Sequence, residues 1–143
     1  MKVFSPAFKN NEAIDKKYTC QGEDINPPLT IEEIPPEAKS LALIVEDPDA
    51  PGSTFIHWVV FDIPIICQIE ENSIPGKQGI NDFKRENYGG PCPPSGTHRY
   101  FFKVFALDME LKLEKGITKE TLEKSMVGHT LAQAEIIGLY KKD

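Results

Sequence analysis

The sequence predicts a mainly β fold: a β-sandwich of two antiparallel sheets with Greek-key connections and one or two peripheral C-terminal helices. Short segments rich in Val, Ile, Phe and Tyr are separated by turns marked by proline and glycine. A clear helical period appears only near the C-terminus, which excludes parallel β-α-β units because these need a helix between strands. The length of 143 residues suits one domain that spans residues 1–143.

Three apolar segments are expected to be strands of the core, because apolar side chains occupy both of their faces. They are Ser40 to Val45, Thr54 to Phe61 and Tyr100 to Leu107. In the second segment, strict alternation places His57 on the opposite face from Ile56 and Trp58. The long connection over residues 65–87 has a length that is often functional.

The C-terminal part of the chain contains the helical signal. Residues 117–127, ITKETLEKSMV, predict a helix with Thr118 as its N-cap and Gly128 just beyond its end. Residues 129–135, HTLAQAE, predict a second short helix or a turn. The last segment, residues 135–142, is expected to be a closing edge strand, because isoleucines favour strands and the terminal lysines discourage further pairing.

Composition narrows the classes of partner and location. The net charge is −6 and the sequence has no cluster of Lys or Arg, which argues against a surface that binds nucleic acid. Net charge does not exclude a site for a small anion, because local backbone amides can bind one. The cysteines Cys20, Cys67 and Cys92 are odd in number and lack metal-like spacing, so a reduced protein without disulfides is expected. No signal peptide or membrane span is recognised, and a cytoplasmic location is expected. No cofactor and no metal are expected.

The segment from Tyr88 to Tyr100, YGGPCPPSGTHRY, predicts a rigid loop before a strand. Gly89 and Gly90 can adopt positive φ and leave their amides uncovered, while the prolines fix φ. In the strand that follows, His98 and Tyr100 share one face, because side chains two residues apart point the same way. The loop is therefore a candidate cradle for a ligand.

Six side chains from three strand ends are candidates for chemistry: Asp47, Asp49, His57, Tyr88, His98 and Tyr100. If they converge, the histidines, the tyrosine and the glycine amides offer donors suited to the oxygens of a phosphate or phosphoryl ester. Asp47 would accept from an imidazole N–H and favour the charged imidazolium. Anion affinity should then fall as the pH rises through the titration of the histidines.

Each candidate also has a structural interpretation. His57 could be a hydrogen-bonded core histidine, and the aspartates of EDPDAP could cap a turn. Arg99 suits an internal ion pair, and His129 suits the C-terminal end of a helix. Cys92 could be a reactive thiol or an inert packed cysteine.

Two hydrolase alternatives use the same residues. A metal hydrolase would need His57, His98, Asp47 and Asp49 as ligands, but no H-x-x-x-H pair anchors such a site. A serine hydrolase would pair Ser53 or Ser95 with a histidine and an aspartate, but the sequence has no G-x-S-x-G elbow. A non-enzymatic anion-binding protein is therefore the preferred interpretation.

The motifs DPDAP at residues 47–51, HW at 57–58 and GGPCPPSGTHRY at 89–100 resemble the phosphatidylethanolamine-binding proteins, also called Raf kinase inhibitor-like proteins. The ending GHTLAQAEIIGLY also agrees, and the short bacterial and archaeal branch is the most similar. The resemblance implies a β-sandwich with a small preformed pocket for phosphate or phosphoryl head groups. It also implies a regulatory role, such as inhibition of a kinase or a protease.

The resemblance further implies which residues form the pocket: Asp47, Pro51, His57, Gly90, Pro91, His98 and Tyr100, with the Gly89 backbone beside them. It implies a cis bond before Pro51, and a homodimer, which short microbial members often form. The chain lacks the extensions that border the pocket in eukaryotic members, so Raf-type inhibition is not carried over. Asp62 departs from the asparagine of many relatives.

Overall fold

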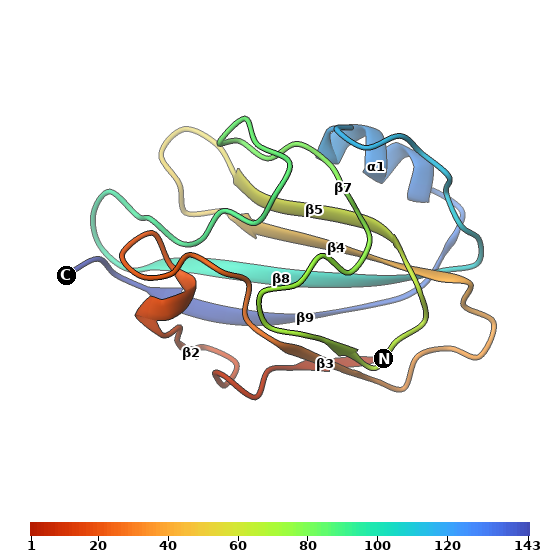
Figure 1. Cartoon of the computed structure of the whole chain (residues 1–143), viewed down its shortest axis with the longest axis horizontal. Helices are drawn as coiled ribbons and strands as arrows, with labels where there is room; N and C mark the ends of the chain where they lie inside the picture. The colour runs from red at the N-terminus through yellow and green to blue at the C-terminus, as the bar shows by residue number, and fades with distance from the viewer.

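The computed structural model describes residues 1–143 as two β-sheets packed face to face, with one α-helix against the outer side of the larger sheet (Figure 1). The smaller sheet, in the order β1-β3-β6, contains β1 (Lys2–Phe4), β3 (Leu29–Glu32) and β6 (Gln68–Ile69). The larger sheet, in the order β2-β9-β8-β4-β5-β7, contains β2 (Glu12–Ala13), β9 (Thr130–Tyr140), β8 (His98–Leu107), β4 (Ser40–Asp47), β5 (Phe55–Ile63) and β7 (Lys77–Gln78). The helices are α1 (Lys119–Met126) and a 3-10 turn, η1 (Lys16–Tyr18). The predicted mainly β sandwich is confirmed.

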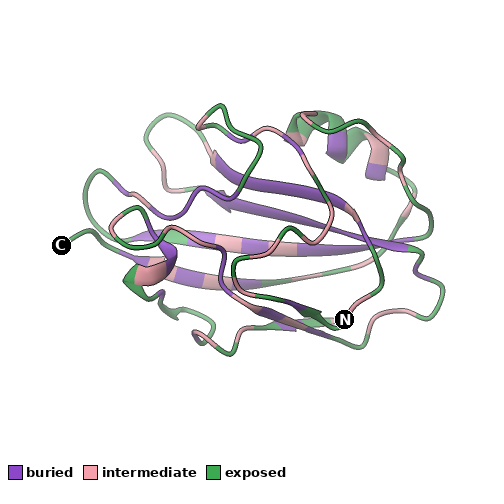
Figure 2. Ribbon diagram, viewed as in Figure 1, coloured by how far each residue is buried: buried purple, intermediate pink, exposed green.

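Two apolar cores flank the larger sheet. The inter-sheet core joins alternate residues of β4 and β8, such as Val45 and Phe102, to Leu29 and Ile31 of the smaller sheet. The outer core packs the opposite face of β4 and β5 against α1. Because both faces of β4 are covered, the strand is buried along its whole length (Figure 2). The central positions predicted for β4 and β8 follow from this double coverage.

The helix α1 is confirmed, and it is the one α-helix of the chain. The Thr118 hydroxyl accepts from the Thr121 amide at its start, and Gly128 beyond its end has φ of 80°. The second helix or turn predicted over residues 129–135 is wrong beyond His129, which ends the turn after α1, because residues 130–135 belong to strand β9. Pairing with β8 along its length overrides the helical propensity of Leu, Ala, Gln and Glu there.

Strand β9 lies almost at the sheet edge, as predicted. Only the two-residue strand β2 lies outside it, pairing parallel with Gly138 and Leu139. The larger sheet is therefore not purely antiparallel, which corrects the expectation.

A β-bulge in β5 changes which side chains share a face. Val45 pairs with Trp58 and Glu46 pairs with Ile56, so His57 is an extra residue between two paired positions. As a result, Ile56 joins the outer core, whereas Trp58 lies in the inter-sheet core. The strict alternation predicted for this strand is wrong for that reason.

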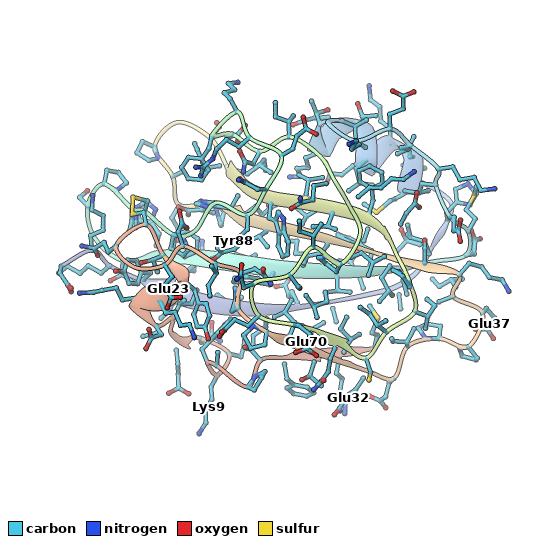
Figure 3. The ribbon with its side chains drawn as sticks, in the orientation of Figure 1. Lys9, Glu23, Glu32, Glu37, Glu70 and Tyr88 are labelled. Atoms are coloured by element: carbon cyan, nitrogen blue, oxygen red, sulfur yellow. A yellow bond between two sulfur atoms is a disulfide. The ribbon has the colours of Figure 1, made fainter.

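The cysteines also differ from expectation. Cys20 and Cys92 form a disulfide, visible in Figure 3 as a yellow bond at the end of the molecule where the C-terminus emerges, and Cys67 is free and exposed. The two residues are 72 positions apart in sequence, and folding brings their Cα atoms to 5.5 Å. The predictions of a fully reduced chain and of a free Cys92 thiol are therefore wrong. The predicted cis bond before Pro51 is also wrong, since every peptide bond is trans.

Candidate functional site

A cavity of about 300 Å³ lies at one end of the larger sheet. It is formed where β4 ends and where β5 and β8 begin, because antiparallel neighbours place these ends together. Its lining residues are Asp47, Ala50, Pro51, Phe55, His57, Phe83, Cys92, Pro93, Pro94, His98 and Tyr100. The three sequence segments expected to converge do so here.

The structure separates the predicted site residues into two groups. Asp47, Pro51, His57, His98 and Tyr100 line the cavity. Gly89, Gly90 and Pro91 lie behind it and do not contribute to its wall. The loop 88–97 reaches the cavity instead through Cys92, Pro93 and Pro94.

His98 is held by Asp47. Its Nδ1–H donates to Oδ2 of Asp47 over 2.6 Å, and the other Asp47 oxygen accepts from the Asp49 amide at 2.8 Å. Both side chains are buried. The carboxylate fixes the ring, so that Nε2 is the atom left for a ligand, and the predicted hydrogen bond between Asp47 and an imidazole is confirmed.

His57 reaches the cavity because of the bulge. Its Nδ1 lies 2.7 Å from the Gly89 carbonyl oxygen, and the rings of Phe55, Phe83 and Tyr100 contact it edge-on. Burial lowers the pKa of His57, although the Gly89 carbonyl and the Asp47 carboxylate oppose the shift. The expectation that both histidines carry positive charge is therefore wrong for His57.

The Tyr100 hydroxyl is a buried polar group without a partner. The residue is 1% exposed, and no protein atom meets hydrogen-bond geometry with the hydroxyl oxygen, although the Asp47 carboxylate and the Cys92 backbone lie close enough to influence it. Burial, reinforced by the negative charge of Asp47, raises the pKa of Tyr100, so the phenol stays protonated and can donate. A buried hydroxyl that lines a cavity in this state is suited to a ligand oxygen.

The two glycines serve close packing. The Gly89 amide donates to the His57 carbonyl oxygen at 3.0 Å, and the Gly90 amide donates to Oδ1 of Asp24 at 2.7 Å. A Cβ on Gly89 would collide with the Phe83 ring, and one on Gly90 would collide with the Tyr18 carbonyl. The prediction of uncovered amides is therefore wrong, because both donors already have partners.

The remaining candidates lie outside the cavity wall. Asp49 forms a two-pronged ion pair with Arg99, at 2.9 Å from Nε and 2.8 Å from Nη2, which confirms the ion pair expected for Arg99. These hydrogen bonds lower the pKa of Asp49. The Tyr88 hydroxyl donates to the Tyr18 carbonyl at 2.8 Å. No lysine or arginine lines the cavity.

Several lining residues were not predicted. Phe55, Phe83, Ala50, Pro93 and Pro94 form the apolar part of the wall. Phe83 comes from the long connection 65–87, whose length was the only signal for it. The two prolines lie within the rigid loop predicted before β8, but the sequence does not show which side chains of that loop face the cavity.

The chain shows neither a metal-binding cluster nor a helix suited to a membrane. No group of three or more His, Cys, Asp or Glu side chains could hold a metal ion. None of the helices has the length and apolar character needed to cross a membrane.

Comparisons with known proteins agree with the fold and the motifs. A family model described as phosphatidylethanolamine-binding protein matches residues 4–141. The chain belongs to this family. Among known proteins, a UPF0098 protein from Aquifex aeolicus is 54% identical, covering 100% of this chain and 90% of the relative. A UPF0098 protein from Methanothermobacter thermautotrophicus is 47% identical, with 99% of each chain covered.

Solved structures of phosphatidylethanolamine-binding protein homologues share the fold. CT736 from Chlamydia trachomatis superposes with a TM-score of 0.96 at 44% identity, covering 99% of this chain and 97% of that one. YbcL from E. coli, a member of the mammalian PEBP family, superposes with a TM-score of 0.91 at 30% identity, covering 99% and 98%.

Proposed function

We propose that this phosphatidylethanolamine-binding protein homologue binds a small oxyanion in the cavity and acts as a regulator without catalysing a reaction. The ligand class comprises phosphate, a phosphoryl head group or a phosphorylated residue of a partner protein. The observation that carries the proposal is the buried, unpartnered Tyr100 hydroxyl, which lines the same cavity as His57 and His98.

The cavity can supply donors and one positive charge. Tyr100 offers its O–H, and His98 in its imidazolium form offers Nε2–H while Asp47 balances its charge. A small apolar enclosure around these groups strengthens their interactions with a charged ligand.

Titration calorimetry with inorganic phosphate tests the proposal. We expect binding by the wild type and a loss of affinity of about tenfold or more in Tyr100→Phe, which removes only the hydroxyl. Tyr18→Phe is the matched control, because its hydroxyl bonds to Glu71 and does not line the cavity. Absence of phosphate binding by the wild type would refute the proposal.

A small phosphoester or peptide hydrolase is a second candidate. The observation that favours it is the Asp47–His98 pair, since a carboxylate-held imidazole can act as a general base. Incubation with generic phosphoester, ester and peptide substrates, with and without a chelator, distinguishes the two functions. Turnover that disappears in His98→Ala would favour the hydrolase, whereas competition by phosphate without product would favour the binding protein.

Three finer proposals accompany the main one. The chain forms one domain over residues 1–143, pairs as a homodimer, and binds a kinase or protease as its protein partner.

We also propose a cytoplasmic location, and the Cys20–Cys92 disulfide is relevant to it. Disulfides are rare in most cytosols, although intracellular proteins of hyperthermophiles contain them. Alkylation of free thiols in cell fractions would report both the location and the redox state.

A further inference from the structure

We propose that the cavity selects an oxyanion that carries a proton, such as inorganic phosphate, over an oxyanion that carries none, such as sulfate. The inference rests on the proposed function and adds a rule for the ligand: one of its oxygens must donate a hydrogen bond to Nε2 of His57.

The hydrogen bond between His57 and Gly89 fixes the tautomer of the imidazole. A carbonyl oxygen can only accept, so Nδ1, 2.7 Å away, must carry the hydrogen. In a neutral ring the remaining nitrogen, Nε2, is then an acceptor. The ring's one hydrogen bond uses Nδ1, so Nε2 is left without a protein partner in a side chain that lines the cavity.

The surroundings keep His57 neutral. The charged groups that act on His57 are the carboxylates of Asp47 and Asp24. Both favour the protonated imidazole, but the effect of burial, which favours the neutral imidazole, is larger. The rings packed against it come from Phe55 and Phe83, which carry no charge, and from Tyr100, which stays protonated. The other titratable side chain of the cavity is His98, which is held by Asp47, and no lysine, arginine or further carboxylate lines the cavity.

The three polar groups of the cavity thus need different hydrogen-bond partners on the ligand. The Tyr100 O–H and the Nε2–H of an imidazolium at His98 are hydrogen-bond donors. Each of them needs a ligand oxygen as its acceptor. His57 presents a lone pair instead. An oxyanion with no hydrogen would set one of its own lone pairs against that of Nε2, whereas a ligand O–H would complete the hydrogen bond.

Phosphate and sulfate differ in this one property. Hydrogen phosphate and sulfate are both tetrahedral dianions, but hydrogen phosphate retains one O–H and sulfate has none. Charge and shape are matched, so a difference in affinity reports the hydrogen. We expect phosphate to bind at least about tenfold more tightly than sulfate in titration calorimetry.

The variant His57→Gln tests the role of the lone pair. The glutamine amide can turn its NH₂ group toward the cavity and donate where the imidazole accepts. We expect sulfate to bind more tightly than in the wild type, so that the preference for phosphate shrinks severalfold. His129→Gln is the matched control, because His129 is paired with Asp108 on the surface, and it should keep the wild-type preference. Circular dichroism verifies that each variant is folded.

The outcomes separate this inference from the proposed function. Equal affinities of the wild type for phosphate and sulfate overturn the inference but leave anion binding intact. A preference for phosphate that is unchanged in folded His57→Gln also overturns it. If neither anion binds the wild type, the proposed function and the inference fall together.

Discussion

Each cavity histidine is held through Nδ1 by a group that can only accept, and the two groups differ in charge. His98 is held by the carboxylate of Asp47, and His57 is held by the neutral carbonyl of Gly89. The group that accepts from Nδ1 decides whether each histidine can donate or accept toward a ligand. A carboxylate balances the positive charge of an imidazolium, whereas a carbonyl in an apolar enclosure does not. Two residues of the same type can therefore offer a donor and an acceptor to one ligand.

The Asp47–His98 pair gives a first prediction at the residue scale. Asp47→Asn removes the charge that compensates the imidazolium, so phosphate affinity should fall about tenfold or more, and the free energy of unfolding should fall by about 1–3 kcal/mol. Calorimetry and urea unfolding measure the two effects. Asp49→Asn is the control: it weakens only the half-exposed pair with Arg99 and should cost less than about 1 kcal/mol. Equal effects of the two substitutions would contradict the prediction.

The buried His57 gives a second prediction, for stability against pH. Its pKa in the folded state lies below the ordinary value of 6.5, so below pH 6.5 the unfolded chain binds a proton that the folded chain does not. The free energy of unfolding should therefore be highest above pH 6.5 and decrease as the pH falls toward the folded-state pKa, by at most about 1.4 kcal/mol per pH unit.

Urea unfolding at several pH values between about 7.5 and 5.5 measures this slope. His57→Gln should flatten it, because it removes the group whose pKa is lowered by folding. A slope that is the same in His57→Gln as in the wild type would disprove the assignment to His57.

At the scale of elements, the bulge in β5 decides whether a site exists. Counted back from Trp58, strict alternation would put His57 on the outer face of the sheet, away from His98 and Tyr100. The extra residue between the pairs Val45–Trp58 and Glu46–Ile56 turns the ring toward the cavity. Apolar residues on both faces predict the strand, but they do not reveal where an extra residue is inserted.

The other misjudged elements have a similar cause. Residues 130–135 have good helical propensity, and only their pairing with β8 makes them a strand. The cysteine spacing predicts no bridge, because the closeness of Cys20 to Cys92 depends on the folded loop. Local sequence therefore predicts the strands that are buried on both faces, and long-range contacts determine the rest.

The Cys20–Cys92 disulfide gives a third prediction, at the scale of the loop 88–97. Cys92→Ser should lower the free energy of unfolding by about 2–5 kcal/mol, because the bridge closes a long loop in the unfolded chain. Phosphate affinity should fall as well, since Cys92 and the two prolines after it line the cavity. Urea unfolding and calorimetry under oxidising conditions measure both.

The free, exposed Cys67 provides the control for that experiment. Cys67→Ser should match the wild type in stability and in phosphate affinity. Reducing agent should lower the stability of the wild type to that of Cys92→Ser and leave Cys92→Ser unchanged. If reduction changed neither stability nor binding, the bridge would have no part in the cavity.

At the scale of the whole molecule, the meeting of three distant segments was predictable. Each ends or begins a strand of one antiparallel sheet, and the polar residues were recognisable against apolar surroundings. The occupied amides of Gly89 and Gly90 were not predictable, because their acceptors lie on His57 and on Asp24. The sequence thus indicated where the cavity lies but not which of its groups are free to bind.

The proposed homodimer gives a fourth prediction, at the open edge of β9. The Ile137 backbone bonds to the segment at Asn10 and Asn11, on the side away from β8. By alternation, the backbone N–H of Gln133 points to the same side, where no strand covers it.

We expect a second copy to pair at this edge. Gln133→Pro removes the outward N–H without breaking a bond to β8, so it should shift sedimentation from dimer toward monomer. Gln133→Ala keeps the N–H and serves as the control. A dimer that persists unchanged in Gln133→Pro would place the interface elsewhere.

The pairing of β2 with β9 joins Glu12 near the start of the chain to Gly138 near its end. During synthesis, β2 can pair with β9 only after almost the entire polypeptide has left the ribosome. His98 and Asp47 also lie far apart in sequence, so their hydrogen bond forms only after β8 has been synthesised. A nascent chain stalled before β8 would carry half of the ligand-binding groups and an uncovered flank of β4, a natural target for chaperones.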